Sequence, residues 1–344
     1  MRLNYPLYGQ MRRRDDGAMD SLHTSAGSDD AAAGRVGATA RAGSSDLRGA
    51  RDAVALRRRR EGSWLMVAGG LLLGTLGVFV EEAAQDPLTT VWFRCAFGGV
   101  ALFLYGAATG RLRELRLVGR ARWAALGAGV LMVANWALFF AAIPRTSIGV
   151  ATVVFHVQPL WVMVFGALWL GEAAGRSHWL AALVALAGLA LASGLLDPAQ
   201  AALAQRPGYF TGLLLCLGGS LSYAGVTLIA KTARTLSSFA LAWWQCLVGA
   251  VLTLWWPLLA GWPAPGAAWG WLAGLGVLHT GLAYVVLYAG MGRLSTSRIA
   301  LLQFVYPAAA VLVDWLVYGR LLSPVQWTGV ALMGVALWSV RRGA

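Results

Sequence analysis

The chain has 344 residues, of which 58% are hydrophobic and only 12% are charged. Soluble globular domains carry about 25% charged residues, so this composition excludes an ordinary soluble domain. Its 43 glycines and 17 tryptophans are typical of membrane helices and their interfaces. The net charge of +13 comes from a tail and short loops rather than a folded basic domain, so the lipid bilayer is an expected partner and nucleic acid is not.

The first 60 residues differ in composition from the rest. They are rich in Arg, Asp, Ala, Gly and Ser and lack hydrophobic periodicity, which predicts a disordered basic cytosolic tail over residues 1–60. No short apolar stretch precedes a small-residue cleavage site, so a signal peptide is not expected. A start codon assigned too far upstream is the alternative, with Met11 or Met19 as other starts.

From Ser63 onward the sequence is a series of apolar runs, each near the roughly 20 residues that cross ~30 Å of hydrocarbon. Charged residues, glycines and prolines separate the runs. We therefore predict an all-α integral membrane protein with ten transmembrane helices. The expected spans are residues 63–80, 88–108, 121–142, 147–170, 177–195, 208–230, 237–259, 267–290, 296–318 and 324–340.

The distribution of Lys and Arg predicts the orientation of these spans. If the N-terminus is cytosolic, the inner segments hold sixteen of these residues and the outer segments only Arg145, Arg206 and Arg320. Short cytosolic loops are enriched in positive charge. Both termini are therefore expected in the cytosol.

An internal repeat appears when the second half is slid over the first by 148 residues. This shift superposes Arg145 on Arg293, Pro159 on Pro307 and Trp179 on Trp327. It predicts two five-helix repeats, over residues 63–195 and 208–340. Since five is odd, the repeats would have opposite topology, an arrangement typical of secondary transporters that work by alternating access.

Short motifs in both halves resemble the EamA-type repeat of the drug/metabolite transporter (DMT) superfamily. They are residues 144–151, 158–160 and 169–172 in the first half, and Tyr306-Pro307 with 318–320 in the second. Arg94 lies where the family often has an arginine at the start of the second helix. Arg320 stands where the family usually has a glutamate, so the role of that acid is not carried over to the second half.

The resemblance implies a ten-helix fold with a central cavity and secondary transport of small organic metabolites. Export of amino acids or related compounds across the bacterial inner membrane is the common activity. An importer, or a drug, nucleoside or sugar permease of the same fold, is the alternative. A monomer and a homodimer both remain open, and no cofactor is implied.

Polar side chains within the predicted spans are the candidate substrate-binding residues, because such groups usually face the bundle interior or a water-filled path. Four of them adjoin Pro159 or Pro307, each of which removes a backbone donor and favours a bent helix. Hydrogen bonding between neighbouring helices is the alternative role. The candidates are His156, Gln158, Gln303, Tyr306, Asn135 and Tyr284.

Three further residues are candidates for coupling to protons or other cations. Asp314 is the only carboxylate deep in a predicted span, with Arg94 as one possible partner; near the outer interface it would instead be solvated or salt-bridged. His279 could titrate near neutral pH, although a hydrogen-bonded structural role is the commoner one. Glu172, at the inner end of its span, is expected to cap a helix and form a salt bridge.

Enzymatic chemistry has little support in the sequence. We find no HExxH, GxSxG or P-loop pattern. Cys95, Cys216 and Cys246 lie in apolar runs without CxxC spacing, so neither a metal site nor a disulfide framework is expected. An integral-membrane enzyme is the less favoured alternative to a transporter.

Overall fold

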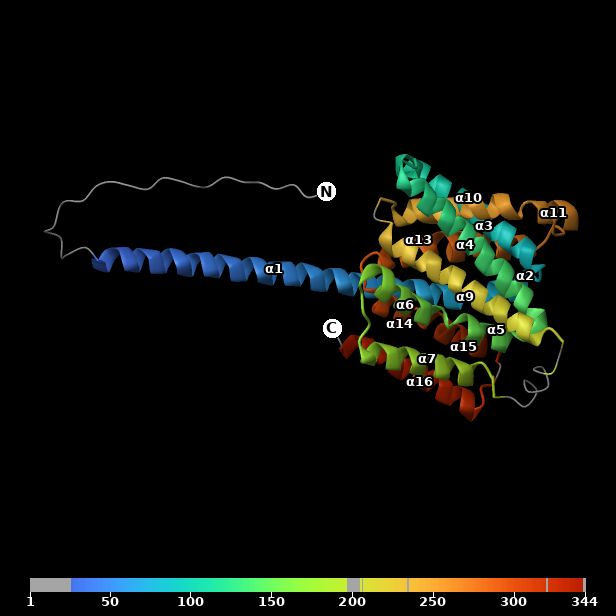
Figure 1. Cartoon of the computed structure of the whole chain (residues 1–344). Helices are drawn as coiled ribbons and strands as arrows, with labels where there is room; N and C mark the ends of the chain where they lie inside the picture. The colour runs from blue at the N-terminus through green and yellow to red at the C-terminus, as the bar shows by residue number, and fades with distance from the viewer. Residues whose placement is uncertain (1–25, 197–204, 206, 234, 320, 343–344) are drawn as a thin grey trace, which may run out of the picture. The chain divides into compact units, whose positions relative to one another are not determined.

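The computed structural model describes residues 26–196, 205, 207–233, 235–319 and 321–342, and within these ranges every regular element is a helix (Figure 1). Contacts divide the chain into the units Met1–Leu56 and Arg57–Ala344. The predicted all-α class is therefore confirmed for the described part of the chain.

The first helix, α1 (Ala26–Gly74), includes most of the predicted tail. Disorder was expected over residues 1–60, but from residue 26 onward the chain is helical; residues 1–25 lie outside the described residues. The difference has a local cause, because this segment lacks proline and is rich in Ala and Arg, which favour helix. Residues 57–74 of the helix belong to the second unit.

Several of the remaining helices begin at a side-chain cap. Asp86 accepts a hydrogen bond from the backbone N–H of Leu88, and Ser147 and Ser237 cap later helices in the same way. The first repeat continues with α2 (Leu76–Ala83), α3 (Pro87–Ala108), η1 (Leu112–Leu115), α4 (Arg120–Ala142), η2 (Ile143–Arg145), α5 (Ile148–Phe155), α6 (Gln158–Leu170) and α7 (Arg176–Ala192). The second contains α9 (Tyr209–Thr232), α10 (Ser238–Thr253), α11 (Trp255–Ala260), α12 (Ala268–Gly274), η3 (Leu275–Leu282), α13 (Ala283–Met291), α14 (Thr296–Leu302), α15 (Val305–Tyr318) and α16 (Pro324–Arg342).

Eight helical segments of the described chain are long and apolar enough to cross a membrane. They account for eight of the ten predicted spans. The other two correspond to α7 and α16. α7 has 17 residues and reaches ~26 Å, less than the ~30 Å hydrocarbon core, and α16 has 19 residues and ends in two arginines. The count of ten crossings therefore stays a prediction.

Two spans are interrupted where the prolines predict. Between α5 and α6 the regular helix stops at His156 and Val157, and between α14 and α15 it stops at Gln303 and Phe304. Pro159 and Pro307 lie in the first turn of the helices that follow. A third irregularity, the π-helix η3, carries no proline and was not predicted.

The two repeats are interlocked rather than side by side. A Cβ atom added to Gly69 would lie 2.6 Å from Leu287, and one added to Gly290 would lie 3.0 Å from the carbonyl oxygen of Gly62. The first span therefore runs antiparallel to the segment η3–α13, which is the third span of the second repeat.

The equivalent contact joins α9 to α4. A Cβ atom at Gly212 would lie 2.9 Å from Arg145, and one at Gly225 would lie 2.9 Å from Leu131, so these helices are also antiparallel. The first helix of each repeat thus packs against the third helix of the other repeat.

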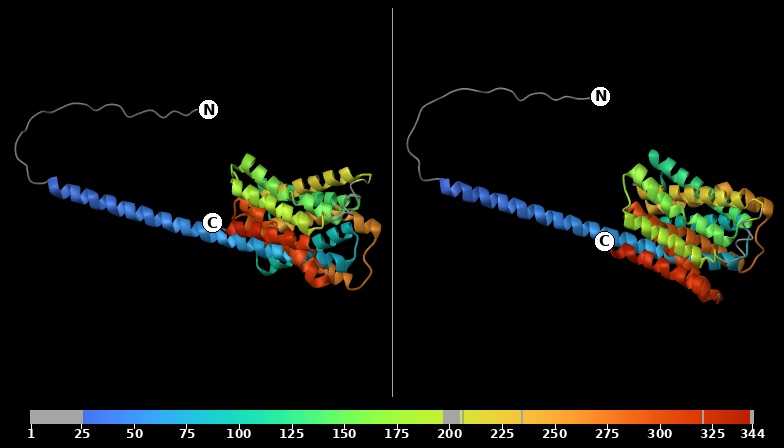
Figure 2. Two further views of the ribbon diagram at one scale, coloured as in Figure 1. Left: turned by 90° about the horizontal axis from the view of Figure 1, so that it is seen from below. Right: turned by 60° about the horizontal axis from the view of Figure 1, so that its bottom comes forward.

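The last helices of the repeats, α7 and α16, lie next to each other in Figures 1 and 2. A Cβ atom at Gly188 would lie 2.7 Å from the carbonyl oxygen of Gly329, and Gln326 Nε2 donates to the carbonyl of Ala192 at 3.3 Å. The numbering runs in opposite directions along this contact. Because the 148-residue shift matches these two helices, their antiparallel packing agrees with the predicted inverted relation of the repeats.

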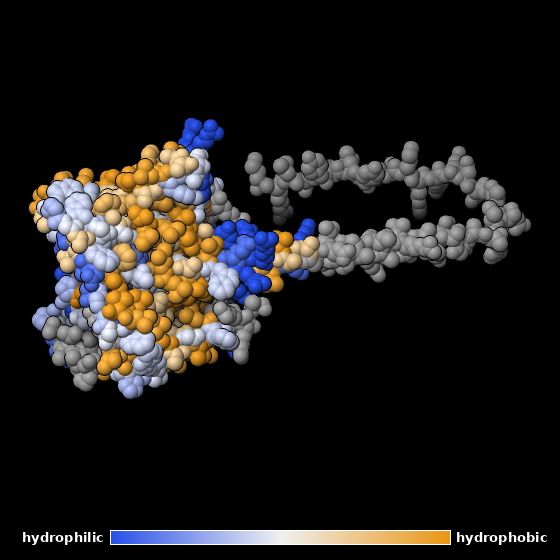
Figure 3. Space-filling model, turned by 180° about the vertical axis from the view of Figure 1, so that it is seen from behind, coloured by the Kyte–Doolittle hydropathy of each residue, from blue (hydrophilic) through white to orange (hydrophobic). Residues whose placement is uncertain are grey.

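Apolar side chains cover much of the face of the second unit seen in Figure 3. Large hydrophobic residues on several helices are strongly exposed, such as Leu104, Trp169, Leu180 and Leu258 at 60%, 70%, 64% and 63%. A soluble monomer rarely exposes so much apolar surface. Together with the eight apolar spans, this surface identifies a multi-pass membrane protein.

Candidate functional site

Two glutamines, one from each interrupted span, meet on a single hydroxyl. Gln158 Nε2 donates to Thr227 Oγ1 at 3.2 Å, and Gln303 Nε2 donates to the same oxygen at 3.1 Å. Thr227 lies on α9, is fully buried, and donates in turn to the carbonyl of Tyr223 at 3.0 Å. The interruptions cause this convergence, because Gln158 begins α6 and Gln303 lies between α14 and α15.

His156 and Tyr306 face each other beside these glutamines. Their ring centroids are 5.9 Å apart. His156 Nδ1 donates to the carbonyl of Thr152 at 2.7 Å, which fixes the ring at the end of α5. The four residues predicted beside the prolines therefore lie near one another. The two glutamines are joined by Thr227, a residue that the sequence did not point to.

Arg94 is a charged side chain buried inside the helix bundle. It lies on α3 and is only 4% exposed. Its Nε donates to Thr280 Oγ1 at 2.9 Å, and its guanidinium carbon lies 4.9 Å from the centroid of the Trp136 ring. None of the ion pairs between described residues includes Arg94, so the structure does not pair it with Asp314.

Three tyrosines pack in the same cluster as Trp136, the ring that lies against Arg94. They are Tyr223, Tyr284 and Tyr306, which come from α9, α13 and α15. We call Arg94 and these three tyrosines the arginine–tyrosine cluster. It unites two predicted residues, Tyr284 and Tyr306, with a predicted coupling residue. Tyr223 was missed because a single tyrosine in an apolar helix carries no motif.

The π-helix η3 positions one edge of this cluster. Thr280 donates to the carbonyl of Leu275, five residues earlier, at 3.0 Å, while its hydroxyl oxygen accepts from Arg94. Gly98 and Gly276 allow α3 to approach η3, since a Cβ atom at Gly98 would lie 2.9 Å from the Gly276 carbonyl oxygen. Such π segments often occur at functional sites.

Asn135 lies on α4 at the margin of the cluster. Its Nδ2 lies 3.8 Å from the sulfur of Met132, which also contacts the Tyr284 hydroxyl at 4.0 Å. Its Oδ1 is buried and has no hydrogen-bond partner in the described part of the chain. An acceptor left unsatisfied in this way costs free energy, which a polar ligand or a water molecule can recover.

The other two candidate coupling residues lie apart from the glutamines. His279 is fully buried, contacts Thr75 Oγ1 through Nε2 at 2.8 Å, and packs on Phe79. Asp314 is half-buried on α15, one turn before Tyr318, whose hydroxyl donates to Glu82 at 3.2 Å. The contacts of His279 fit the structural role, and no contact described here joins Asp314 to the cluster.

Glu172 closes one end of the bundle, as expected of a cap and salt-bridge partner. Its Oε1 lies 2.9 Å from Lys231 Nζ, and its Oε2 accepts from the backbone N–H of Thr296 at 2.8 Å. Lys231 also donates to the Leu294 carbonyl at 2.6 Å. Burial opposes ionisation of Glu172, but the Thr296 amide and Lys231 outweigh it and hold the pKa of this carboxyl below its usual range.

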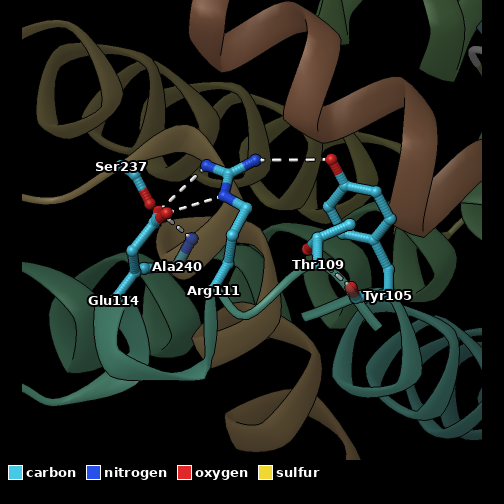
Figure 4. Close-up of polar contacts among 6 residues, drawn as sticks. All are labelled: Tyr105, Thr109, Arg111, Glu114, Ser237 and Ala240. Carbon is cyan, nitrogen blue, oxygen red and sulfur yellow. Dashed lines mark hydrogen bonds and ion pairs between the residues drawn. The ribbon is translucent and has the colours of Figure 1, made fainter. Parts of the chain in front are cut away.

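A second ion pair joins Arg111 and Glu114 in the loop after α3 (Figure 4). Arg111 donates to both carboxylate oxygens of Glu114, at 2.6 and 2.9 Å, and these bonds lower the pKa of Glu114. Glu114 also bonds Ser237, which accepts from the N–H of Ala240. This pair therefore ties the loop after α3 to the start of α10.

A metal site is not evident. No three His, Cys, Asp or Glu side chains lie together as a possible metal-binding group in the part of the chain that the structure describes.

Comparison with known proteins gives matches along most of the chain. Residues 60–194 and 210–342 match the family described as "EamA-like transporter family". The "Uncharacterized transporter YxxF" of Bacillus subtilis is 26% identical over 282 residues, which are 80% of this chain and 89% of that protein. An "Uncharacterized transporter" of Archaeoglobus fulgidus is 29% identical over 278 residues, or 80% and 95% of the two chains.

A solved structure supports the fold. The chain described as "Crystal structure of protein" superposes with a TM-score of 0.72 and is 21% identical, covering 82% of this chain and 98% of its own length. The matches to family, relatives and fold span both repeats.

Proposed function

Because the chain belongs to the EamA-like transporter family, we propose that it is a secondary transporter that exports small organic metabolites, such as amino acids or related compounds. It would act by alternating access in the bacterial inner membrane, with both termini in the cytosol. The relatives are transporters by name, which supports a transport role rather than an enzymatic one.

The meeting of Gln158 and Gln303 on Thr227 carries this proposal. Transporters built from inverted repeats place their substrate site at the repeat interface, on helices that are interrupted near the membrane centre. Here each repeat contributes one span that is interrupted before a proline, and a glutamine at each of these interruptions bonds the same helix, α9. A tilt of either span at its interruption would change the contacts of the shared hydroxyl.

Transport by the purified full-length chain in proteoliposomes tests the proposal. We expect saturable counterflow of a labelled amino acid or related metabolite from a broad panel. The double variant Gln158→Leu with Gln303→Leu should lose this counterflow. Gln85→Leu is the matched control, because Gln85 Nε2 bonds only the nearby carbonyl of Ala83. Absence of counterflow for amino acids, sugars, nucleosides and drugs alike would refute the transporter proposal.

Asp314 is proposed as the coupling residue, because it is the carboxylate within the span Thr296–Tyr318. Inside-out vesicles with an imposed pH gradient test this role. Gradient-dependent uptake that disappears in Asp314→Asn would support proton-coupled export. Uptake that is unchanged in the variant would remove Asp314 from the mechanism and leave the transport proposal standing.

A further inference from the structure

The arginine–tyrosine cluster holds a positive charge without a described counter-charge. Only 4% of Arg94 is exposed to solvent. The three ion pairs between described residues all involve other side chains. A buried charge without a partner is costly, and within membrane spans such groups usually face a substrate path. The missing negative charge is therefore one that a bound solute can supply.

Hydrogen-bond donors around this charge are also uncommitted. Arg94 uses only Nε, towards Thr280, so its two terminal nitrogens donate to no side chain or carbonyl of the described residues. The hydroxyls of Tyr223 and Tyr306 likewise have no hydrogen bond to any residue described, and Tyr284 has only the weak contact with Met132. Four of these five donor groups thus have no acceptor among the described residues, and the fifth has only the methionine sulfur.

We propose that the arginine–tyrosine cluster binds the carboxylate group of the transported solute, so that the substrates are organic acids rather than cations. This inference rests on the transport function proposed above. The free edge of the guanidinium presents two parallel N–H groups, a geometry that matches a planar carboxylate. One arginine balances one negative charge, which favours a carboxylate over a phosphate dianion.

The surroundings of Arg94 suit a flat apolar body on the solute. Trp136 covers one face of the guanidinium, the Phe155 ring lies 5.9 Å from Tyr223, and the His156 ring lies 5.9 Å from Tyr306. No acidic side chain among the described contacts of the cluster is available for an ammonium group. The site therefore discriminates by charge against amines that carry no carboxylate.

Equilibrium binding to the full-length protein in nanodiscs tests the inference. The labelled probe is phenylacetate, with phenylacetamide, phenethylamine and benzyl phosphate as competitors of similar shape; 4-methylpentanoate with its amide and amine repeats the test on an aliphatic body. We expect at least one of the two carboxylates to bind at least about tenfold more tightly than its amide, as expected for hydrogen bonds to a charged group. The amine and the phosphate should compete still more weakly.

Variants assign this preference to the cluster. Arg94→Gln should reduce carboxylate binding about tenfold and leave amide binding unchanged, and Arg94→Lys should retain part of the preference. Tyr306→Phe should weaken carboxylate binding to a smaller extent. Arg122→Gln is the matched control, because Arg122 also lies over a tryptophan, Trp123 at 5.4 Å, but outside the cluster. Thermal unfolding identifies any misfolded variant, in which case Arg94→Lys and Tyr306→Phe carry the test.

Three results would overturn the inference: neither carboxylate binds, an amide, amine or phosphate binds as tightly as its carboxylate, or the folded Arg94 variants keep the full preference. Transport of neutral or cationic solutes without transport of carboxylates would refute this substrate class while the transporter proposal survives. Absence of transport across the whole panel would instead refute the proposed function.

Discussion

At the scale of single residues, Thr227 lies in an apolar stretch without a motif, yet its side chain joins the two interrupted spans. Its hydroxyl oxygen accepts from the side-chain amides of Gln158 and Gln303, which are far apart in sequence, and its hydroxyl donates to the backbone carbonyl of Tyr223. A threonine in an apolar helix usually bonds only its own backbone, as Thr232 does with the carbonyl of Leu228 at 2.7 Å. Thr227 and Thr232, which both lie on α9, therefore form a natural comparison.

We expect Thr227→Val to slow transport by about threefold to twentyfold, since a hydrogen bond between membrane helices contributes ~0.6–1.7 kcal/mol. Initial rates of counterflow in proteoliposomes measure the effect. Thr232→Val is the control and should transport at the wild-type rate. Equal losses in the two variants would show that the amides do not depend on the shared hydroxyl.

Residue patterns predicted part of this site. The prolines drew attention to His156, Gln158, Gln303 and Tyr306 because a proline has a local effect on its own helix, whatever lies around it. Thr227, Tyr223 and Thr280 have no such mark, since their partners come from other helices and are set by packing. Asp314 and Arg94, suggested as a pair by charge alone, have no described contact with each other.

At the scale of helices, glycines decide how closely elements approach. The contact of Gly188 on α7 with the backbone of Gly329 on α16 leaves no room for a Cβ atom. Both helices are short or comparatively polar for membrane spans, so their mutual packing is a main source of their stability. Small residues at such contacts are typical of membrane helix pairs.

We expect Gly188→Ala to destabilise the protein by about 1–3 kcal/mol, because the added methyl group overpacks the contact. Thermal unfolding in detergent measures the loss. Gly334→Ala is the matched control on α16, since a Cβ atom there would have no neighbour within 4 Å. Similar melting temperatures for both variants would contradict the close approach.

Glu172 makes stability depend on pH through the loops that it joins. Its pKa is lowered in the folded protein, so its contribution is present above the unfolded value of about 4.3 and is lost as the pH falls through the folded value. Glu172→Gln should therefore unfold at a lower temperature than wild type at pH 7, and the difference should shrink below about pH 4.

Melting curves from pH 7 down to pH 3 measure this difference. Glu61→Gln is the control, because Glu61 pairs with Arg57 at an exposed site and such pairs contribute little. A wild-type melting temperature for Glu172→Gln at pH 7 would show that its bonds to Thr296 and Lys231 do not stabilise the fold.

The limits of most helices could be predicted from the local sequence, whereas the contacts between helices could not. The limits of the apolar runs lie close to most helix starts, and the prolines mark both interruptions. The helix over residues 26–60 has no hydrophobic periodicity to mark it, and its local support is the helix propensity of Ala and Arg. The π-helix η3 was missed because its geometry depends on close contact with α3.

At the scale of the whole molecule, the arginine-rich loops predict which end faces the cytosol. Glu81 lies near the end of the first span, on α2, and Val118 lies in the loop before α4, and both side chains are exposed. Cysteines introduced at these two positions should report opposite sides of the membrane. The native cysteines Cys95, Cys216 and Cys246 are buried and should contribute little background.

In intact bacterial cells, a membrane-impermeant maleimide should label Glu81→Cys and should label Val118→Cys only after permeabilisation. The reverse pattern would invert the proposed orientation. Labelling of both in intact cells would place the two loops on the same side and contradict the odd number of crossings between them.

The crossed pairing of the repeats has a consequence for how the protein is made. The first span finds its antiparallel partner in η3–α13, about 200 residues later in the chain. At about 5–20 residues per second, the ribosome needs roughly 10–40 s to supply that partner, and until then the small-residue face of the first span is covered only by lipid. Each repeat therefore supplies packing partners for the other during biogenesis. If the gene is split between the repeats, each piece should resist degradation only when both are expressed in the same cell.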